Sequence, residues 1–106
     1  MSLHIILLET NQKMYSLNVL LDKTTKKLLE TVLPRENMTL IYNELHVMNK
    51  KALVLNRKMD SKSESFLNKK VTRQFIFDET QELLSIQKQL DAIQKELLEF
   101  IHVQKL

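Results

Sequence analysis

The chain has 106 residues, a formal net charge of +3, one proline, and neither glycine nor cysteine. Its length fits one domain, and its 43% hydrophobic and 27% charged residues are typical of a folded protein rather than a disordered one. The lack of cysteine excludes disulfides and thiolate metal sites, and the lack of glycine disfavours phosphate-binding loops and nucleophile elbows, which need its backbone freedom.

The first predicted element is a long helix over residues 3–33. Its apolar and threonine positions are spaced alternately by four and three residues, which is typical of a helix that packs along one face. Pro34 must end this helix, because proline cannot continue one and restricts the residue before it. Residues 3–8 are dense in β-branched and apolar side chains, so a short strand remains an alternative there. The spaced positions are Leu3, Leu7, Thr10, Met14, Leu17, Leu21, Thr24, Leu28 and Thr31.

The second predicted helix covers residues 37–59, with Asn37 as its N-cap. A second apolar line, formed by Leu40, Val47 and Val54, repeats every seven residues on a neighbouring face. The apolar surface is therefore wider than a two-stranded seam requires, and we expect this helix to contact more than one neighbour. Its main track consists of Met38, Ile41, Leu45, Met48, Ala52, Leu55 and Met59.

Residues 60–78 are predicted to form a connector, because the periodic pattern fails where residues 60–65 are all polar. Such a link is long for a helical bundle. We therefore expect part of it to extend the second helix or to pack through Phe66, Phe75 and Phe77. An edge strand at residues 71–77, paired with residues 3–8, is a further alternative.

The third predicted helix covers residues 79–104. Asp78 serves as the N-cap and forms a capping box with Gln81. The apolar positions of its main track are again spaced alternately by three and four residues. Additional apolar positions at Leu84, Leu98 and Ile101 widen the apolar face. The track residues are Leu83, Ile86, Leu90, Ile93, Leu97 and Phe100.

These elements predict an all-α fold, a single helical domain over residues 1–106. Up-down-up packing into an antiparallel three-helix bundle is the simplest way to bury all three tracks. The alternative is an extended helical hairpin with coiled-coil heptads that is completed by oligomerisation.

No catalytic, cofactor-binding or metal site is predicted. His4, His46 and His102 lie far apart in the sequence, and no nucleophile with a base and an orienting group can be identified. No apolar run is longer than Ile5–Leu8, whereas a membrane span needs about 20 residues. We therefore expect no transmembrane segment and an intracellular, cytoplasmic location.

Charge is unevenly distributed along the chain. Residues 50–73 carry eight basic side chains against two acidic ones, whereas residues 74–106 carry six acidic against three basic. The basic patch could contact a phosphate backbone, an anionic membrane or an acidic protein. Alternatively, the acidic third helix neutralises it from within the fold. The patch consists of Lys50, Lys51, Arg57, Lys58, Lys62, Lys69, Lys70 and Arg73.

The sequence thus favours a non-enzymatic helical module for protein–protein interaction: an adaptor, a chaperone-like protein or a structural subunit that forms homo- or hetero-oligomers through its helices. The alternative is a small basic nucleic-acid-binding regulator that uses residues 50–73. The candidate partner-binding residues, which serve equally well as core residues, are Leu45, Met48, Leu55, Leu90, Ile93 and Leu97.

Overall fold

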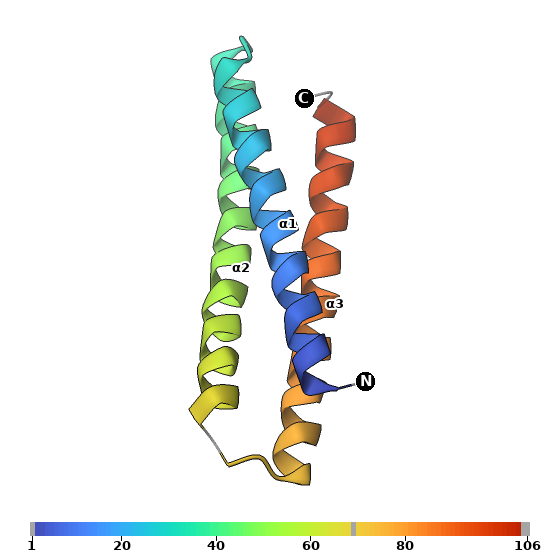
Figure 1. Ribbon diagram of the computed structural model, residues 1–106. Helices are drawn as coiled ribbons and strands as arrows, with labels where there is room; N and C mark the ends of the chain where they lie inside the picture. The colour runs from blue at the N-terminus through green and yellow to red at the C-terminus, as the bar shows by residue number, and fades with distance from the viewer. Residues whose placement is uncertain (1, 69, 105–106) are drawn as a thin grey trace.

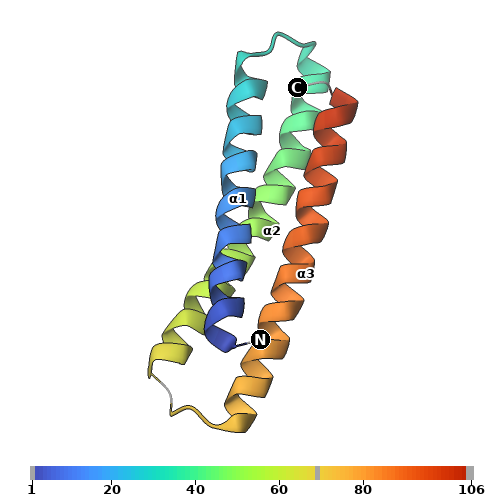
Figure 2. The same cartoon turned by 45° about the vertical axis from the view of Figure 1, so that its right-hand side comes forward.

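The computed structural model describes residues 2–68 and 70–104, and its elements are three helices: α1 (Leu3–Glu30), α2 (Arg35–Asn68) and α3 (Arg73–Gln104). The chain runs up, down and up, so α1 and α3 are parallel and α2 is antiparallel to both (Figures 1 and 2). The predicted all-α antiparallel three-helix bundle is confirmed. The two strand alternatives are wrong, because residues 3–8 are helical and residues 71–77 form a short link and the start of α3.

The bundle is long and thin, measuring 56 × 21 × 16 Å. Its radius of gyration is 16.7 Å, whereas a compact domain of this length has a value of about 13 Å. The core is therefore a narrow column of side chains between three helices, and a large part of each helix faces outward. None of the helices in the described range has a stretch apolar and long enough to cross a membrane.

The predicted tracks form the core. Every track position of α3 is buried, and on α2 only Met38 is less than fully buried. The predicted positions of the first helix are buried except Leu7 and Thr31, which are only partly buried, and Ile6 is buried beside Leu7. Each buried leucine contributes about 1.5–3 kcal/mol to the free energy of unfolding. The fully buried large side chains are Leu17, Leu21, Leu28, Leu45, Met59, Leu83, Leu90 and Leu97, with Thr10 beside them.

The helices near Pro34 begin and end at different residues from those predicted. α1 ends at Glu30, because Thr31 turns to an extended backbone with ψ 132° and its amide bonds to the Leu28 carbonyl oxygen. α2 already begins at Arg35, and the Pro34 carbonyl oxygen accepts a hydrogen bond from the Met38 amide at 3.0 Å. The predicted N-cap at Asn37 is therefore wrong, since this residue lies within the first turn.

The predicted connector over residues 60–78 is wrong as an irregular link, but the expectation that part of it extends the second helix is confirmed. Phe66 and Phe75 pack against the core as expected, whereas Phe77 is 59% exposed. α2 continues to Asn68 and α3 begins at Arg73, so only a short link joins them. The Oγ1 atom of Thr72 accepts a hydrogen bond from the Phe75 amide at 3.1 Å, and this side chain caps α3 in place of Asp78. Asp78 instead lies inside the helix, where it accepts a hydrogen bond from Gln74.

The connector was mispredicted because charged residues occupy core positions. The three-four spacing of α2 continues beyond Met59 through Lys62 to Phe66, and Glu79 lies one turn before Leu83 on α3. The Nζ atom of Lys62 lies 3.2 Å from Oε1 of Glu79, so the two charges meet inside the bundle. Both helices continue through these charged positions, where the apolar track is interrupted.

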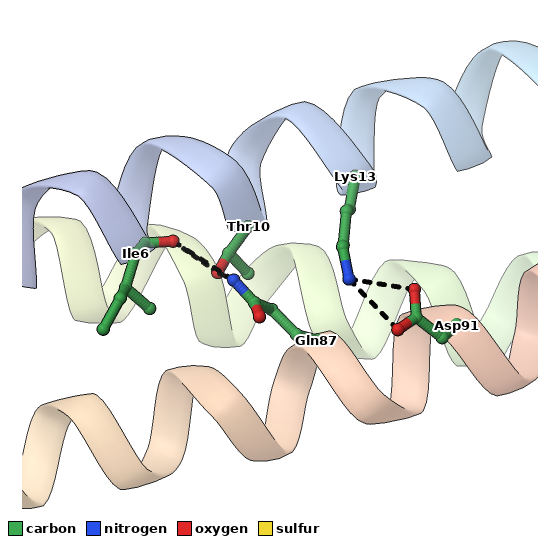
Figure 3. Close-up of polar contacts among 5 residues, drawn as sticks. All are labelled: Ile6, Thr10, Lys13, Gln87 and Asp91. Carbon is green, nitrogen blue, oxygen red and sulfur yellow. Dashed lines mark hydrogen bonds and ion pairs between the residues drawn. The ribbon is translucent and has the colours of Figure 1, made fainter. Parts of the chain in front are cut away.

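Polar contacts also join α1 to α3 (Figure 3). The Oγ1 atom of Thr10 donates to the Ile6 carbonyl oxygen at 2.7 Å and accepts from Nε2 of Gln87 at 2.9 Å. One turn farther on, Lys13 pairs with Asp91 at 3.0 Å. These contacts fix the register of α1 against α3, because any slide of the helices would leave the polar groups without partners.

Candidate functional site

The three seams of the bundle are not equally closed. α1 packs closely against both α2 and α3, whereas α2 and α3 meet each other least. In Figure 1, α1 lies in front of this pair, so the pair's far side has no third helix over it. A series of hollows follows that side, lined by residues 37–62 of α2 and 82–104 of α3. We call this surface the α2–α3 groove.

Apolar side chains line the α2–α3 groove along much of its length. Leu40, Val47 and Val54 each line a different hollow, and they are 65%, 50% and 50% exposed. They form the second apolar line of the sequence pattern, which therefore lies outside the core. A helix face that carries such residues every seven positions is typical of one that receives another helix.

The six predicted partner-binding residues are all inside the bundle and at most 6% exposed. Met48, Leu55 and Ile93 form part of the groove floor, whereas Leu45, Leu90 and Leu97 line none of its hollows. All six act as core residues in this arrangement. The side chains that a docking protein would meet first are those of the second apolar line. The sequence pattern had indicated these residues only as a widening of the apolar face of the second helix.

The two ends of the α2–α3 groove carry opposite charge. Among the described residues, the end near the C-terminus of α3 is lined by the carboxylates Glu44, Glu96 and Glu99 and by no basic side chain; we call it the acidic half. The other end, the basic half, is lined by the three cations Arg57, Lys58 and Lys62 and the single carboxylate Glu82. The charge of the groove therefore changes from negative to positive along its length, and any molecule that lies along it meets both.

The predicted basic patch is divided among three elements. Lys50, Lys51, Arg57, Lys58 and Lys62 lie on α2, Lys70 lies in the link and Arg73 begins α3; Lys69 lies outside the described residues. Two of these cations contact the acidic third helix, as the neutralisation alternative predicts. Lys51 pairs with Glu96 at 3.5 Å, and Lys62 pairs with both Glu79 and Glu82.

Among the described cations of this patch, Lys62 is the one whose side chain is largely buried. Its side chain is only 22% exposed, and that of Glu79 is 12% exposed. Burial alone would lower the pKa of the amine, but the hydrogen bonds to Glu82 and Glu79 outweigh it, so the pKa lies above its ordinary value of 10.5. Lys62 is therefore a charged residue that holds α2 to α3 at one end of the groove.

The histidines lie on the surface and do not meet one another. His4, His46 and His102 are all exposed. Glu99 and His102 are three residues apart, the spacing that di-metal helical bundles use on two helices, but neither of the other two histidines follows a glutamate by three residues. In the part of the chain that the structure describes, no group of three or more histidine, aspartate or glutamate side chains gathers to hold a metal ion.

The α2–α3 groove is thus the surface on which apolar side chains, hollows and an ordered charge pattern coincide. No family model, no curated protein and no solved structure matches the chain.

Proposed function

We propose that the chain is a non-enzymatic protein–protein interaction module whose α2–α3 groove receives an apolar helix face of a protein partner. The observation that carries this proposal is the line formed by Leu40, Val47 and Val54, which remains half-exposed or more beside the hollows of the groove. A docked helix would complete the packing that α1 provides on the opposite side of α2 and α3.

The energetics favour a partner that covers the groove along its length. Covering a half-exposed valine contributes about 1 kcal/mol, whereas association costs at least about 4 kcal/mol in lost translational and rotational freedom. One hollow alone is therefore too small a contact. A helix that follows the groove meets all three exposed residues and also lies over Met48, whose flexible side chain adapts to different surfaces.

An adaptor, a chaperone-like protein and a structural subunit of a complex would all use the groove in this way. The proposal is tested by affinity capture from native cells at moderate salt, followed by mass spectrometry. The groove variant carries Val47→Glu and Val54→Glu. The control carries Leu8→Glu, because Leu8 is 52% exposed but lies on α1, away from the groove.

We expect the same partner proteins with the unmodified chain and the control, and their loss with the groove variant. Circular dichroism confirms that all three proteins remain helical. Capture of the same set by the groove variant would contradict the proposal.

The same preparation also tests the nucleic-acid alternative. Phosphate binding weakens steeply as salt rises, whereas apolar helix association persists. If nucleic acid is retained at low salt, and is lost with Lys70→Ala and Arg73→Ala but not with the groove variant, then the basic residues rather than the groove carry the function.

A further inference from the structure

The charge pattern of the α2–α3 groove indicates which partner fits it. The acidic half presents Glu44, Glu96 and Glu99, and the basic half presents Arg57, Lys58 and Lys62. A molecule complementary to this groove must be basic where the groove is acidic and acidic where it is basic. The same groove, turned end for end, has this property.

We infer that the groove binds a second copy of the chain, with the two copies antiparallel and related by a two-fold axis across the middle of the groove. This inference rests on the proposed function and specifies its partner. An isologous contact of this kind uses one surface twice, so the acidic half of each copy covers the basic half of the other. In a parallel arrangement like charges would face each other at both ends, which is unfavourable.

Four of the charged side chains are available for contacts between copies. Glu44, Arg57, Lys58 and Glu99 are exposed and make no ion pair with the other described residues. Lys62 and Glu96, in contrast, already pair across the groove. The ion pairs of Lys62 and Glu96 therefore hold α2 to α3. The four unpaired charges remain available to select the orientation of the second copy.

The groove is also large enough for a dimer. Its hollows follow α2 from residue 37 to residue 62, about 38 Å at 1.5 Å per residue. Multiplied by the 16 Å shortest extent of the bundle, this gives roughly 600 Å² per copy and about 1,200 Å² in total, the lower end of stable interfaces. The accessible surface of 7589 Å² also exceeds the roughly 6,200 Å² expected for a compact monomer of this mass.

The first test measures the mass of the purified chain by sedimentation and light scattering across the micromolar range. An all-basic groove carries Glu44→Lys and Glu99→Lys, and an all-acidic groove carries Arg57→Glu and Lys58→Glu. We expect a dimer for the unmodified chain, at least about 100-fold weaker association for each variant alone, and a heterodimer when the two variants are mixed. The control, Glu9→Lys with Glu30→Lys on α1, matches the charge change of the first variant and should remain dimeric.

The second test establishes orientation, and the absence of cysteine makes it direct. Asn37→Cys and Ser61→Cys place single thiols at exposed positions of α2, about 36 Å apart along the helix. With a short bismaleimide linker, an antiparallel dimer links the first variant to the second when they are mixed. A parallel dimer links each variant to itself, and this result would overturn the inference.

Failure of the inference is distinguishable from failure of the proposed function. A chain that stays monomeric throughout, but whose captured partners are lost with Val47→Glu and Val54→Glu, keeps the groove as the binding surface and removes the second copy. A dimer that persists in the all-basic, all-acidic and Val47→Glu/Val54→Glu variants uses another surface and overturns the inference. Circular dichroism of each variant ensures that loss of dimer is not loss of fold.

Discussion

The two seams that α1 makes with α2 and α3 differ from the α2–α3 seam in the side chains that hold the helices together. The α1 seams are closed by buried leucines and by matched polar groups: Thr10 with Gln87 on α3, and Asn18 with Asn56 on α2. The α2–α3 seam is joined by the ion pairs of Lys51 and Lys62, and hollows lie between and beyond them. α1 therefore fixes the register of the bundle, whereas the α2–α3 side is the one left with room for another helix.

The largest expected effect on stability comes from placing a charged side chain in the hydrophobic core that all three helices share. Leu45→Asp or Leu90→Lys would bury an unpaired charge at positions that are 2% and 1% exposed. The penalty is on the order of 5 kcal/mol, similar to the whole stability of a small domain. We expect the cooperative unfolding transition in urea, followed by circular dichroism, to disappear.

Leu53→Asp is the control for this experiment, because Leu53 is also on α2 but is 49% exposed. It should unfold cooperatively at a urea concentration near that of the unmodified chain. A cooperative transition in either core variant would show that these leucines are not essential to the core.

The next largest effect should come from Lys62→Met, which breaks the charged contact of the α2–α3 seam. Glu79 would keep its buried position without its cation, and we expect the free energy of unfolding to fall by about 2 kcal/mol at neutral pH. Lys58→Met, an exposed change on the same helix, should have little effect. Equal losses for the two variants would contradict a specific role for Lys62.

The contribution of Lys62 should also depend on pH. Because folding raises the pKa of its amine above 10.5, the protonated form is favoured in the folded state, and its stabilisation is fully present below 10.5. It is lost as the pH rises through the raised pKa. The stability difference between the unmodified chain and Lys62→Met should therefore be constant at neutral pH and shrink in alkaline urea titrations.

A smaller loss of stability is expected from a substitution at the α1–α3 seam. Thr10→Val keeps the shape of a residue with 0% exposure but removes the hydroxyl that bonds Ile6 and Gln87. The expected loss is about 1 kcal/mol in urea unfolding. Thr39→Val removes a similar backbone bond at an exposed site, so its effect should be smaller, and the reverse order would refute the importance of the Gln87 contact.

The smallest effect on stability should come from a substitution in the α2–α3 groove. Val47→Ser changes a half-exposed groove residue, and the free energy of unfolding of the isolated chain should shift by no more than about 0.5 kcal/mol. Thermal unfolding of dilute protein measures this shift. A loss as large as that for Thr10→Val would mean that Val47 belongs to the core rather than to a docking surface.

Much of the fold could be predicted because the three-four spacing is a local property of the sequence. The third-helix track from Leu83 to Phe100 is buried at every predicted position. The prediction failed where a charge stands on the track: Lys62 and Glu79 are polar in sequence, so the pattern indicated a connector. Only their pairing across two helices shows that both belong to regular helix.

The candidate site was predicted less well than the fold. The main tracks were proposed as partner contacts, but a track that packs against its own chain cannot be distinguished in sequence from one that packs against another. Leu40, Val47 and Val54 were noticed as a second line, and their spacing was the signal that pointed to the groove.

By itself, the sequence determined that the chain forms three helices and which side chains face the core, because helical periodicity and the helix-breaking effect of Pro34 act over a few residues. Only the tertiary structure decided which pair of helices would remain open. That choice depends on how α1 divides its packing between α2 and α3, and on the ion pairs that Lys51 and Lys62 make with residues distant in the sequence. An ion pair between separate helices leaves no periodic signal in either helix alone, and the spacing within one helix does not say which neighbour will cover it.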